Sequence, residues 1–451
     1  MTSDQTTHTD PRTLLDDAPM GRAQILAVAI TVALNALDGF DVLAISFAAP
    51  GIVAEWNINR AELGVVLAME LIGMSLGSIM LGGLTDRFGR RPANLGCLML
   101  MTVGMLLSAT AGSVIELGMW RVLTGIGIGG MLASINATAA EYANRKSRNL
   151  CVSLMAIGYP LGAIVGGTIA AQLLRLFDWR AVFFFGAGMT ALMIPLTFIL
   201  LKETVPYLCQ RRPAHALEKV NRELRRLGHP TVDRLPEVST DHDETSPLAI
   251  FNPAMLRTTL MLTLAYFMHI ATFYFLLKWI PEIVVGMGFT PAHAAGVLIW
   301  ANIGGASGGI LLGLLGRYLP IRQITMAALC LSVVTVIWFG QGANSLAHMS
   351  LVAGLTGFCT NAGVVGLYAL FAQRFPTAHR ASGTGFAIGV GRGGAALSPI
   401  VVGVLFTMGL GLQGVAVIMA LGAAIAVAAL LILGKSPAEM NKQATRPDGR
   451  T

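Results

Sequence analysis

Charge is what this sequence has least of for its length. Acidic and basic residues together make up 12% of the 451 residues, whereas soluble globular domains average about 25%. Hydrophobic residues account for 54% of the chain, and its mean hydropathy is +0.67. Because so few charges cannot cover the surface of a soluble protein of this length, the composition excludes the soluble classes and predicts a membrane protein.

Cysteine and clustered histidine are also scarce. The five cysteines include no C-x-x-C pair, and four of them lie within apolar runs, so neither a disulfide framework nor a zinc site is predicted. The eight histidines are scattered, no glycine-rich phosphate loop follows a strand, and no nucleophile stands beside a base. We therefore expect no enzymatic activity, no metal and no cofactor.

The start of the chain lacks the pattern of a cleavable signal peptide, because residues 1–21 are polar and contain no apolar core. We expect residues 1–22 to form a disordered cytoplasmic tail. The formal net charge is +7, but most of the positive residues lie in the polar stretches between apolar runs. That distribution indicates membrane topology, and nucleic acid is not expected as a partner.

Twelve long apolar runs are what the sequence does contain. Each approaches or exceeds the roughly 20 residues that cross a bilayer as a helix, and backbone in lipid must be helical to satisfy its own hydrogen bonds. The 52 glycines suit close packing of such helices. The pattern predicts an all-α membrane protein with twelve transmembrane helices in two six-helix bundles. The runs cover residues 23–53, 62–83, 93–112, 117–140, 149–174, 179–201, 256–281, 291–315, 322–340, 346–371, 381–408 and 413–433.

A long polar stretch divides the runs into two sets of six. We predict an N-terminal bundle at 23–201, a central loop at 202–255, a C-terminal bundle at 256–433 and a tail at 434–451. Residues 213–228 of the loop are predicted to form a short amphipathic helix. Lys and Arg concentrate in the central loop and in the turns on the same side, so both termini are expected in the cytoplasm.

The stretch between the second and third runs, residues 82–91, reads G-G-L-T-D-R-F-G-R-R. Its carboxylate, Asp86, can face the N-terminus of a neighbouring helix, where the helix dipole stabilises negative charge by about 0.3–1 kcal/mol. Arg87, Arg90 and Arg91 can bind carboxylates and the carbonyl ends of helices. We interpret the stretch as part of a gate; the alternative is a basic loop that only sets the topology.

Two sequence echoes at a shared offset of about 230 residues predict that the two halves are homologous repeats. The stretch Gly83-Leu-Thr-Asp-Arg87 recurs in degenerate form as Gly313-Leu-Leu-Gly-Arg317. Arg148, followed by Ala-Ile-Gly at 156–158, is echoed by Arg380, followed by Ala-Ile-Gly at 387–389.

The first run carries two acidic residues where the middle of a spanning helix is expected. Asn35, Asp38 and Asp41 are spaced by three and therefore share one helical face. A charged side chain at the bilayer centre costs about 2.5–3.5 kcal/mol, so these acids must face protein or water. Two carboxylates one turn apart repel each other when both are ionised, which favours a role in carrying protons. The alternative is that fixed polar partners hold both acids.

The D-G-F-D sequence at 38–41, together with the motif at 82–91, resembles the aromatic acid:proton symporters of the major facilitator superfamily, and the resemblance covers nearly the whole chain. It implies a carrier of the bacterial inner (plasma) membrane that takes up benzoates, hydroxybenzoates, protocatechuate or related acids such as muconate, driven by the proton gradient. Further matches are Arg121-Val-Leu-Thr-Gly-Ile-Gly, Glu141-Tyr, Gly158-Tyr-Pro-Leu-Gly, Arg380-Ala-Ser-Gly-Thr-Gly and Gly391-Arg-Gly.

Two positions depart from the family pattern. Gly316 stands where the second-half motif has aspartate, so that gate is expected to be weaker. Glu70 stands in the second run where a small apolar residue is expected, and it either shares the coupling proton or marks a subgroup with another substrate.

The resemblance and the polar residues of the spans together define three sets of candidates. For proton coupling we expect Asp38, Asp41 and Glu70. For substrate binding we expect Arg392 to hold the carboxylate, because its planar guanidinium suits bidentate contact. The other candidate substrate-binding residues are Arg121, His269, Tyr266 and Phe273, with Tyr159, Asn136, Asn361, Trp300, Asn302 and Tyr368 as weaker ones. The candidate gating residues are Gly83, Asp86, Arg87, Gly89, Arg90, Arg91, Glu141, Arg145, Arg148, Arg317 and Arg380.

Each assignment has an alternative. Arg392 can pair permanently with a carboxylate of the other bundle, such as Glu70 or Asp41, and Arg121 can extend to the outer interface. The aromatic residues of the seventh run can serve packing alone.

The function also has alternatives, namely uptake of a non-aromatic acid such as muconate or another dicarboxylate, efflux by proton antiport, and, more remotely, a membrane enzyme or a receptor without flux. The antiporter signature G-x-x-x-G-P-x-x-G-G is absent from the fifth run, where Pro160 precedes Gly162. The expected partners are the acid, protons and the lipid bilayer, with the monomer as the functional unit.

Overall fold

The computed structural model describes residues 10–236, 250–343, 345–376 and 379–434, without the side chains of 82–84, 86, 254 and 381. Within these residues it has fifteen α-helices, of which twelve are long and apolar enough to cross a membrane. The prediction of twelve transmembrane helices is therefore confirmed. The first six are α2 (Arg22–Trp56), α3 (Arg60–Phe88), α4 (Arg90–Thr110), α5 (Val114–Tyr142), α6 (Arg148–Leu176) and α7 (Arg180–Leu200). The second six are α10 (Pro253–Gly286), α11 (Pro291–Leu315), α12 (Ile321–Gly340), α13 (Leu346–Arg374), α14 (Arg380–Thr407) and α15 (Leu412–Leu433).

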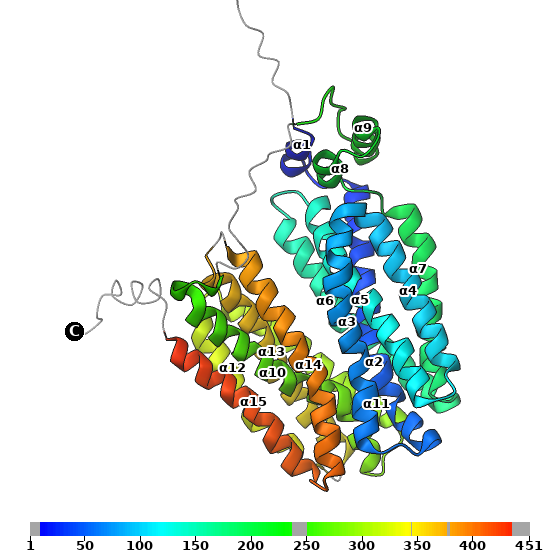
Figure 1. The fold of residues 1–451 in the computed structure, drawn as a ribbon, viewed down its shortest axis with the longest axis vertical. Helices are drawn as coiled ribbons and strands as arrows, with labels where there is room; N and C mark the ends of the chain where they lie inside the picture. The colour runs from blue at the N-terminus through cyan, green and yellow to red at the C-terminus, as the bar shows by residue number, and fades with distance from the viewer. Residues whose placement is uncertain (1–9, 237–249, 344, 377–378, 435–451) are drawn as a thin grey trace, which may run out of the picture. The chain divides into compact units, whose positions relative to one another are not determined.

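The described residues pack into two compact units (Figure 1). Unit 1 takes those of Met1–Ala48 and Met69–His242, and unit 2 takes those of Ala49–Ala68 and Asp243–Thr451. The end of α2 and the start of α3 thus pack with the second six helices. At that contact a Cβ on Gly403 of α14 would lie 2.4 Å from the carbonyl oxygen of Arg60, so only glycine allows the two backbones to meet.

Within unit 1, small residues bring α2 and α6 into backbone contact. A Cβ on Gly162 would lie 1.6 Å from the carbonyl oxygen of Ala36, and one on Gly39 would lie 2.0 Å from that of Tyr159. Such small-residue contacts let membrane helices pack closely without a large apolar side chain between them. They hold the middle of α2, which carries both aspartates, against α6.

The structure corrects the expectation that the whole N-terminal segment is disordered. Residues Pro11–Asp17 form helix α1, with Pro11 in its first turn and Asp10 accepting a hydrogen bond from the Arg12 N–H as a cap. The apolar side chain of Leu15 is buried. The carboxylate of Asp16 lies 2.5 Å from a guanidinium nitrogen of Arg148. Burial of Leu15 and this ion pair supply the tertiary contacts that a short polar segment needs in order to form a helix.

The central loop contains two short helices, α8 (Val205–Arg211) and α9 (Ala216–Leu227). The predicted amphipathic helix at 213–228 is confirmed as α9, whose Val220, Leu224 and Leu227 are buried. These side chains join one apolar cluster with Leu15 of α1 and Leu208 of α8. Figure 1 shows α1, α8 and α9 together at one end of unit 1.

Candidate functional site

The two aspartates of α2 are buried in the core of unit 1. Asp38 and Asp41 are 1% and 0% exposed, and their carboxylate oxygens make no hydrogen bond within the described part of the chain. Asn35, one turn earlier, donates a hydrogen bond of 2.7 Å to the carbonyl of Met155 in α6. The alternative in which fixed polar partners hold both acids therefore has no hydrogen bond to support it among the described residues.

A buried ion pair lies beside these aspartates. A guanidinium nitrogen of Arg121 in α5 is 2.6 Å from a carboxylate oxygen of Glu70 in α3, and both side chains are fully buried. The same nitrogen donates a 2.9 Å hydrogen bond to the main-chain carbonyl of Asp41. The guanidinium carbon also lies 5.3 Å from the ring centroid of Phe183, which adds a cation–π contact.

This arrangement overturns one alternative. Arg121 does not extend to the outer interface, because its side chain is 0% exposed. Its guanidinium forms an ion pair with Glu70. Glu70 is one of the two carboxylates that the sequence analysis considers as permanent partners of Arg392. Arg121 thereby brings α2, α3 and α5 together around three acids, Asp38, Asp41 and Glu70, which interact electrostatically with one another.

A second polar cluster lies in unit 2, on α10, α13 and α14. The hydroxyl groups of Tyr266 and Tyr368 are 2.9 Å apart, and the ring of Phe371 lies 5.6 Å from that of Tyr266. Arg392 is half-buried and interacts electrostatically with both tyrosines. Gly391 permits this approach, since a Cβ there would lie 2.1 Å from the Tyr266 ring.

The two tyrosines differ in exposure, which decides what their cluster can do. Tyr266 is 3% exposed, whereas Tyr368 is 42% exposed, so the pair reaches from the core of unit 2 to its surface. A guanidinium and two phenol groups can together donate hydrogen bonds to a carboxylate, and the adjacent rings can pack on an aromatic ligand. Tyr368 is one of the weaker candidates from the sequence, and nothing in its spacing on α13 relates it to Tyr266 on α10.

Other candidates for substrate contact make packing contacts instead. His269 of α10 is fully buried, and its Nε2 lies 2.8 Å from the carbonyl of Thr360 in α13. Asn361 donates to the carbonyl of Gly305 at 2.7 Å and so joins α13 to α11. Phe273 packs edge-on against Tyr274. Their predicted role in substrate binding stays a prediction.

Tyr159 and Asn136 belong to unit 1. Tyr159 is half-buried in α6, and its backbone meets Gly39 of α2. Asn136 is exposed on α5. The role of both residues in substrate binding stays a prediction.

The predicted gating motif lies at the junction of α3 and α4. Only Gly89 separates the two helices, with a positive φ of 108°, so the motif is the end of one helix and the start of the next rather than a loop. This φ favours glycine at position 89, and the carboxylate of Glu203 occupies the space beside it, where a Cβ would lie 2.3 Å from an oxygen. Gly83 lies within α3, and the side chain of Asp86 lies outside the described part of the structure, so the predicted gating roles of both residues stay predictions.

A carboxylate does cap a helix N-terminus here, but it belongs to Glu203. Its oxygens accept hydrogen bonds from the backbone N–H groups of Arg90 at 2.9 Å and Arg91 at 3.3 Å, at the start of α4. Burial raises the pKa of the Glu203 carboxyl, although these N–H groups oppose the shift. The sequence did not point to Glu203, since a single acid after the sixth apolar run has no distinctive spacing.

The remaining gating candidates divide into paired and exposed residues. Arg90 forms a 2.9 Å ion pair with Glu141, whose other oxygen accepts a 2.5 Å hydrogen bond from Thr204. Arg148 pairs with Asp16, and the Arg145 N–H donates to the Asp16 carbonyl. The exposed candidates are Arg87, Arg317 and Arg380.

Comparison with known proteins agrees with this architecture. The sequence model of the Major Facilitator Superfamily matches residues 31–354. The chain is 29% identical to the gallate transporter of Pseudomonas putida, over 97% of this chain and 98% of that protein. It is also 29% identical to the 4-hydroxybenzoate transporter PcaK of Pseudomonas aeruginosa, over 94% and 96% of the two chains, and to the 3-(3-hydroxy-phenyl)propionate transporter of Escherichia coli, over 91% and 94%. These relatives confirm the resemblance to aromatic acid carriers that the sequence predicted.

Solved structures show the same fold. A D-xylose-proton symporter superposes with a TM-score of 0.70 at 19% identity, covering 91% of this chain and 97% of that one. The inward open xylose transporter XylE from Escherichia coli gives a TM-score of 0.68 at 18% identity, over 93% and 99% of the two chains.

Proposed function

Because this chain belongs to the Major Facilitator Superfamily, we propose that it takes up a small aromatic carboxylic acid together with protons, by alternating access and without a cofactor. The chain is a multi-pass inner-membrane protein and a transporter rather than an enzyme, in line with its twelve spanning helices and bacterial relatives. The names of those relatives, carriers of gallate, 4-hydroxybenzoate and a hydroxyphenylpropionate, support an aromatic acid as the substrate.

The observation that carries the proposal is the pair of buried carboxylates in α2, which form no hydrogen bond with any described residue. If Asp38, Asp41 and Glu70 were all ionised, Arg121 would balance only one of their three charges. Unbalanced charge in a dry interior is costly, so binding of protons to the Asp38–Asp41 pair lowers the energy of the buried state. Release requires water to reach the pair, which links the protonation of α2 to the opening of a path to one side of the membrane.

Recognition of the substrate falls to the tyrosine–arginine cluster. Arg392 supplies a guanidinium for the carboxylate, and the Tyr266 and Tyr368 hydroxyls supply further donors. Phe371, in contact with Tyr266, supplies an apolar face for the ring of the acid. An acid that enters as an anion with one proton adds no net charge, which favours movement through a low-dielectric path.

The division of α3 supports alternating access. Residues 60–68 pack with unit 2, whereas residues 69–88 pack with unit 1. The contact of residues 60–68 with α14 rests on backbone packing at Gly64 and Gly403 and on the Arg60 guanidinium over the Phe406 ring at 4.8 Å. Small residues and one exposed cation form a contact that can separate at modest cost, as alternating access requires on each face.

Uptake into proteoliposomes that contain the purified protein tests the proposal. Labelled benzoate, 4-hydroxybenzoate, protocatechuate, gallate and muconate are supplied outside, with and without an alkaline interior, and internal label is measured over time. We expect accumulation of an aromatic acid only with the gradient. Preferential accumulation of muconate would support the non-aromatic alternative. Expulsion of preloaded acid, driven by protons that enter down their gradient, would support efflux. Either result overturns the proposal.

The same preparation tests the monomer as the functional unit. Nanodiscs that hold one copy each should bind the transported acid with the affinity of the bulk preparation. Loss of binding at one copy per disc would contradict this part of the proposal.

A further inference from the structure

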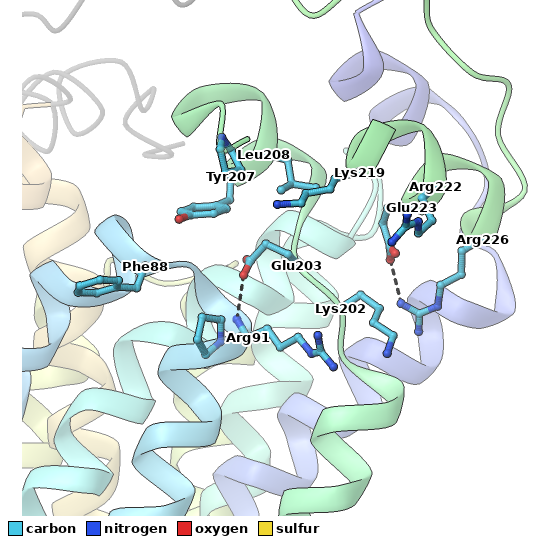
Figure 2. A pocket seen from close by; sticks show the side chains of 12 residues that line it. Phe88, Arg91, Lys202, Glu203, Tyr207, Leu208, Lys219, Arg222, Glu223 and Arg226 are labelled. Carbon is cyan, nitrogen blue, oxygen red and sulfur yellow. Dashed lines mark hydrogen bonds and ion pairs between the residues drawn. The ribbon is translucent and has the colours of Figure 1, made fainter. Parts of the chain in front are cut away.

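A basic pocket lies outside the transport sites, at the end of unit 1 that carries α8 and α9 (Figure 2). Its volume is about 580 Å³, and residues from the end of α3, the start of α4, the linker after α7, and α8 and α9 line it. Five cationic side chains face two carboxylates in this lining. The cations are Arg91, Lys202, Lys219, Arg222 and Arg226, and the carboxylates are Glu203 and Glu223.

Both carboxylates already have partners. Glu203 caps α4 through the N–H groups of Arg90 and Arg91. Glu223 lies 2.9 Å from a guanidinium nitrogen of Arg226 and accepts a hydrogen bond from the Tyr142 hydroxyl. The dashed lines in Figure 2 mark one contact of each acid. The pocket therefore carries an excess of positive charge that its own acids do not neutralise.

The other cations have carbonyl partners or none. Arg91 and Lys202 both donate to the carbonyl of Phe198, at 2.7 and 3.2 Å. Within the described residues, the side chains of Lys219 and Arg222 make no hydrogen bond or ion pair. Burial, together with Arg91 and Arg226, lowers the pKa of the Lys202 amine, against the attraction of Glu223. Like charges gathered in this way are stabilised by an anion from outside the chain.

The surroundings of the pocket indicate which anion. Lys202 lies two residues after the end of α7, and the last turn of that helix exposes the apolar side chains of Phe198 and Ile199, at 56% and 61%. The guanidinium of Arg91 lies 4.4 Å from the ring centroid of Phe198. The cations thus sit where the apolar span ends, at the level of lipid headgroups, beside a surface that acyl chains can cover. A free phosphate would use the charges but not this apolar surface.

We propose that this pocket binds the phosphate headgroup of an anionic phospholipid, with Arg91, Lys202 and Arg226 around the phosphate and the acyl chains against Phe198 and Ile199. Lys219 and Arg222 on α9 add attraction from the aqueous side. Because the lining joins α9 to the α3–α4 junction, the bound lipid holds together the elements that meet at Gly89 and Glu203.

Native mass spectrometry of the full-length protein tests this site, with phosphatidylglycerol and phosphatidylcholine titrated as probes. The test variant is Lys202→Gln with Arg222→Gln. The control, Lys146→Gln with Arg225→Gln, also removes two exposed positive charges from the same end of unit 1 but outside the pocket. Each lost cation should weaken binding of phosphatidylglycerol about fivefold, hence about 25-fold for the test variant and little for the control.

Thermal unfolding with added phosphatidylglycerol, inorganic phosphate or phosphatidylcholine separates the sources of the phosphate. We expect phosphatidylglycerol alone to raise the unfolding temperature of the native protein and of the control, and to have less effect on the test variant. Equal stabilisation by inorganic phosphate would assign the pocket to a soluble anion and overturn the lipid proposal. Equal weakening of lipid binding in both double variants would show that general surface charge, rather than the pocket, attracts the lipid, and would also overturn the lipid proposal.

Discussion

The site in the first half of the chain is built on buried acids, whereas the site in the second half is built on hydrogen-bonded tyrosines. Each is centred on the first spanning helix of its set of six, α2 or α10. In unit 1, α2 carries Asp38 and Asp41, which are dry and without hydrogen bonds among the described residues. In unit 2, α10 carries Tyr266, whose hydroxyl is bonded to the partly exposed Tyr368.

Under the proposed function, this difference separates the two tasks of a coupled carrier. Acids that lack hydrogen-bond partners respond to a proton, because protonation changes the energy of a buried charge strongly. Hydroxyl groups and aromatic rings do not titrate near neutral pH, so they can recognise a ligand without responding to the gradient. Under the proposed function, coupling belongs to unit 1 and recognition to unit 2, and variants of each site should therefore fail in different ways.

The largest effect is expected when coupling is removed from unit 1. The double variant Asp38→Asn, Asp41→Asn should reduce gradient-driven accumulation to equilibration, since amides cannot carry the proton. Asp41→Asn alone should nearly match it, and Asp38→Asn should be similar or slightly milder. Uptake into proteoliposomes measures this, with Glu116→Gln, at a half-buried acid in the first turn of α5 outside both sites, as the control. Accumulation at the native ratio in the double variant would falsify the coupling role.

The ion pair of unit 1 should determine stability rather than recognition. Arg121→Gln leaves Glu70 buried beside two other acids, which should destabilise the protein by about 3–5 kcal/mol. Adding Glu70→Gln should recover most of that loss, because it removes the unpaired charge. Thermal unfolding in one fixed detergent measures both variants. If the second substitution made the protein less stable still, the pair would not be the reason for the loss.

Removal of the Arg392 guanidinium from the cluster in unit 2 should lower the affinity for the acid while leaving the fold intact. Arg392→Ala should cost about 2–5 kcal/mol of binding, or roughly 30-fold or more in Kd. Arg392→Lys should recover only part, because lysine lacks the planar pair of donors. Calorimetric binding of the transported acid measures the change. Because Arg121 already pairs with Glu70, adding Glu70→Gln should not restore binding; restoration would show that Arg392 has a structural role.

The smallest effect should come from the tyrosine pair. Tyr368→Phe removes one hydroxyl from the 2.9 Å contact and should weaken binding by about 0.5–1.5 kcal/mol, with accumulation still driven by the gradient. Tyr318→Phe, at a tyrosine that is 82% exposed, serves as the control. Loss of coupling with unchanged affinity in Tyr368→Phe would mean that the two tasks are not divided between the units.

Some of these sites were accessible from the sequence because they depend on local spacing. Asp38 and Asp41 share a helical face by virtue of a three-residue interval, and an acid in a spanning helix is unusual enough to be noticed. Glu203 and Tyr368 were not comparably visible. Their partners, Arg90 and Tyr266, lie 113 and 102 residues away, and no local pattern specifies such a contact.

Helix α1 in the N-terminal segment could not be predicted from the sequence either. Residues 11–17 form a polar sequence too short to be a stable helix alone, which is why disorder was expected. Burial of Leu15 and the pairing of Asp16 with Arg148 make the helix stable, and both depend on contacts with distant parts of unit 1.

The sequence by itself determined the membrane class, the twelve spans and the amphipathic α9, because hydrophobicity and helical periodicity are local properties that the bilayer and the aqueous interface read directly. Only the tertiary structure decided that Arg121 pairs with Glu70, that the carboxylates of Asp38 and Asp41 form no hydrogen bond with the residues the structure describes, and that Glu203 caps α4. These outcomes depend on which helices pack side by side, and a charge buried in a membrane protein takes its role from the partner that packing brings within about 3 Å.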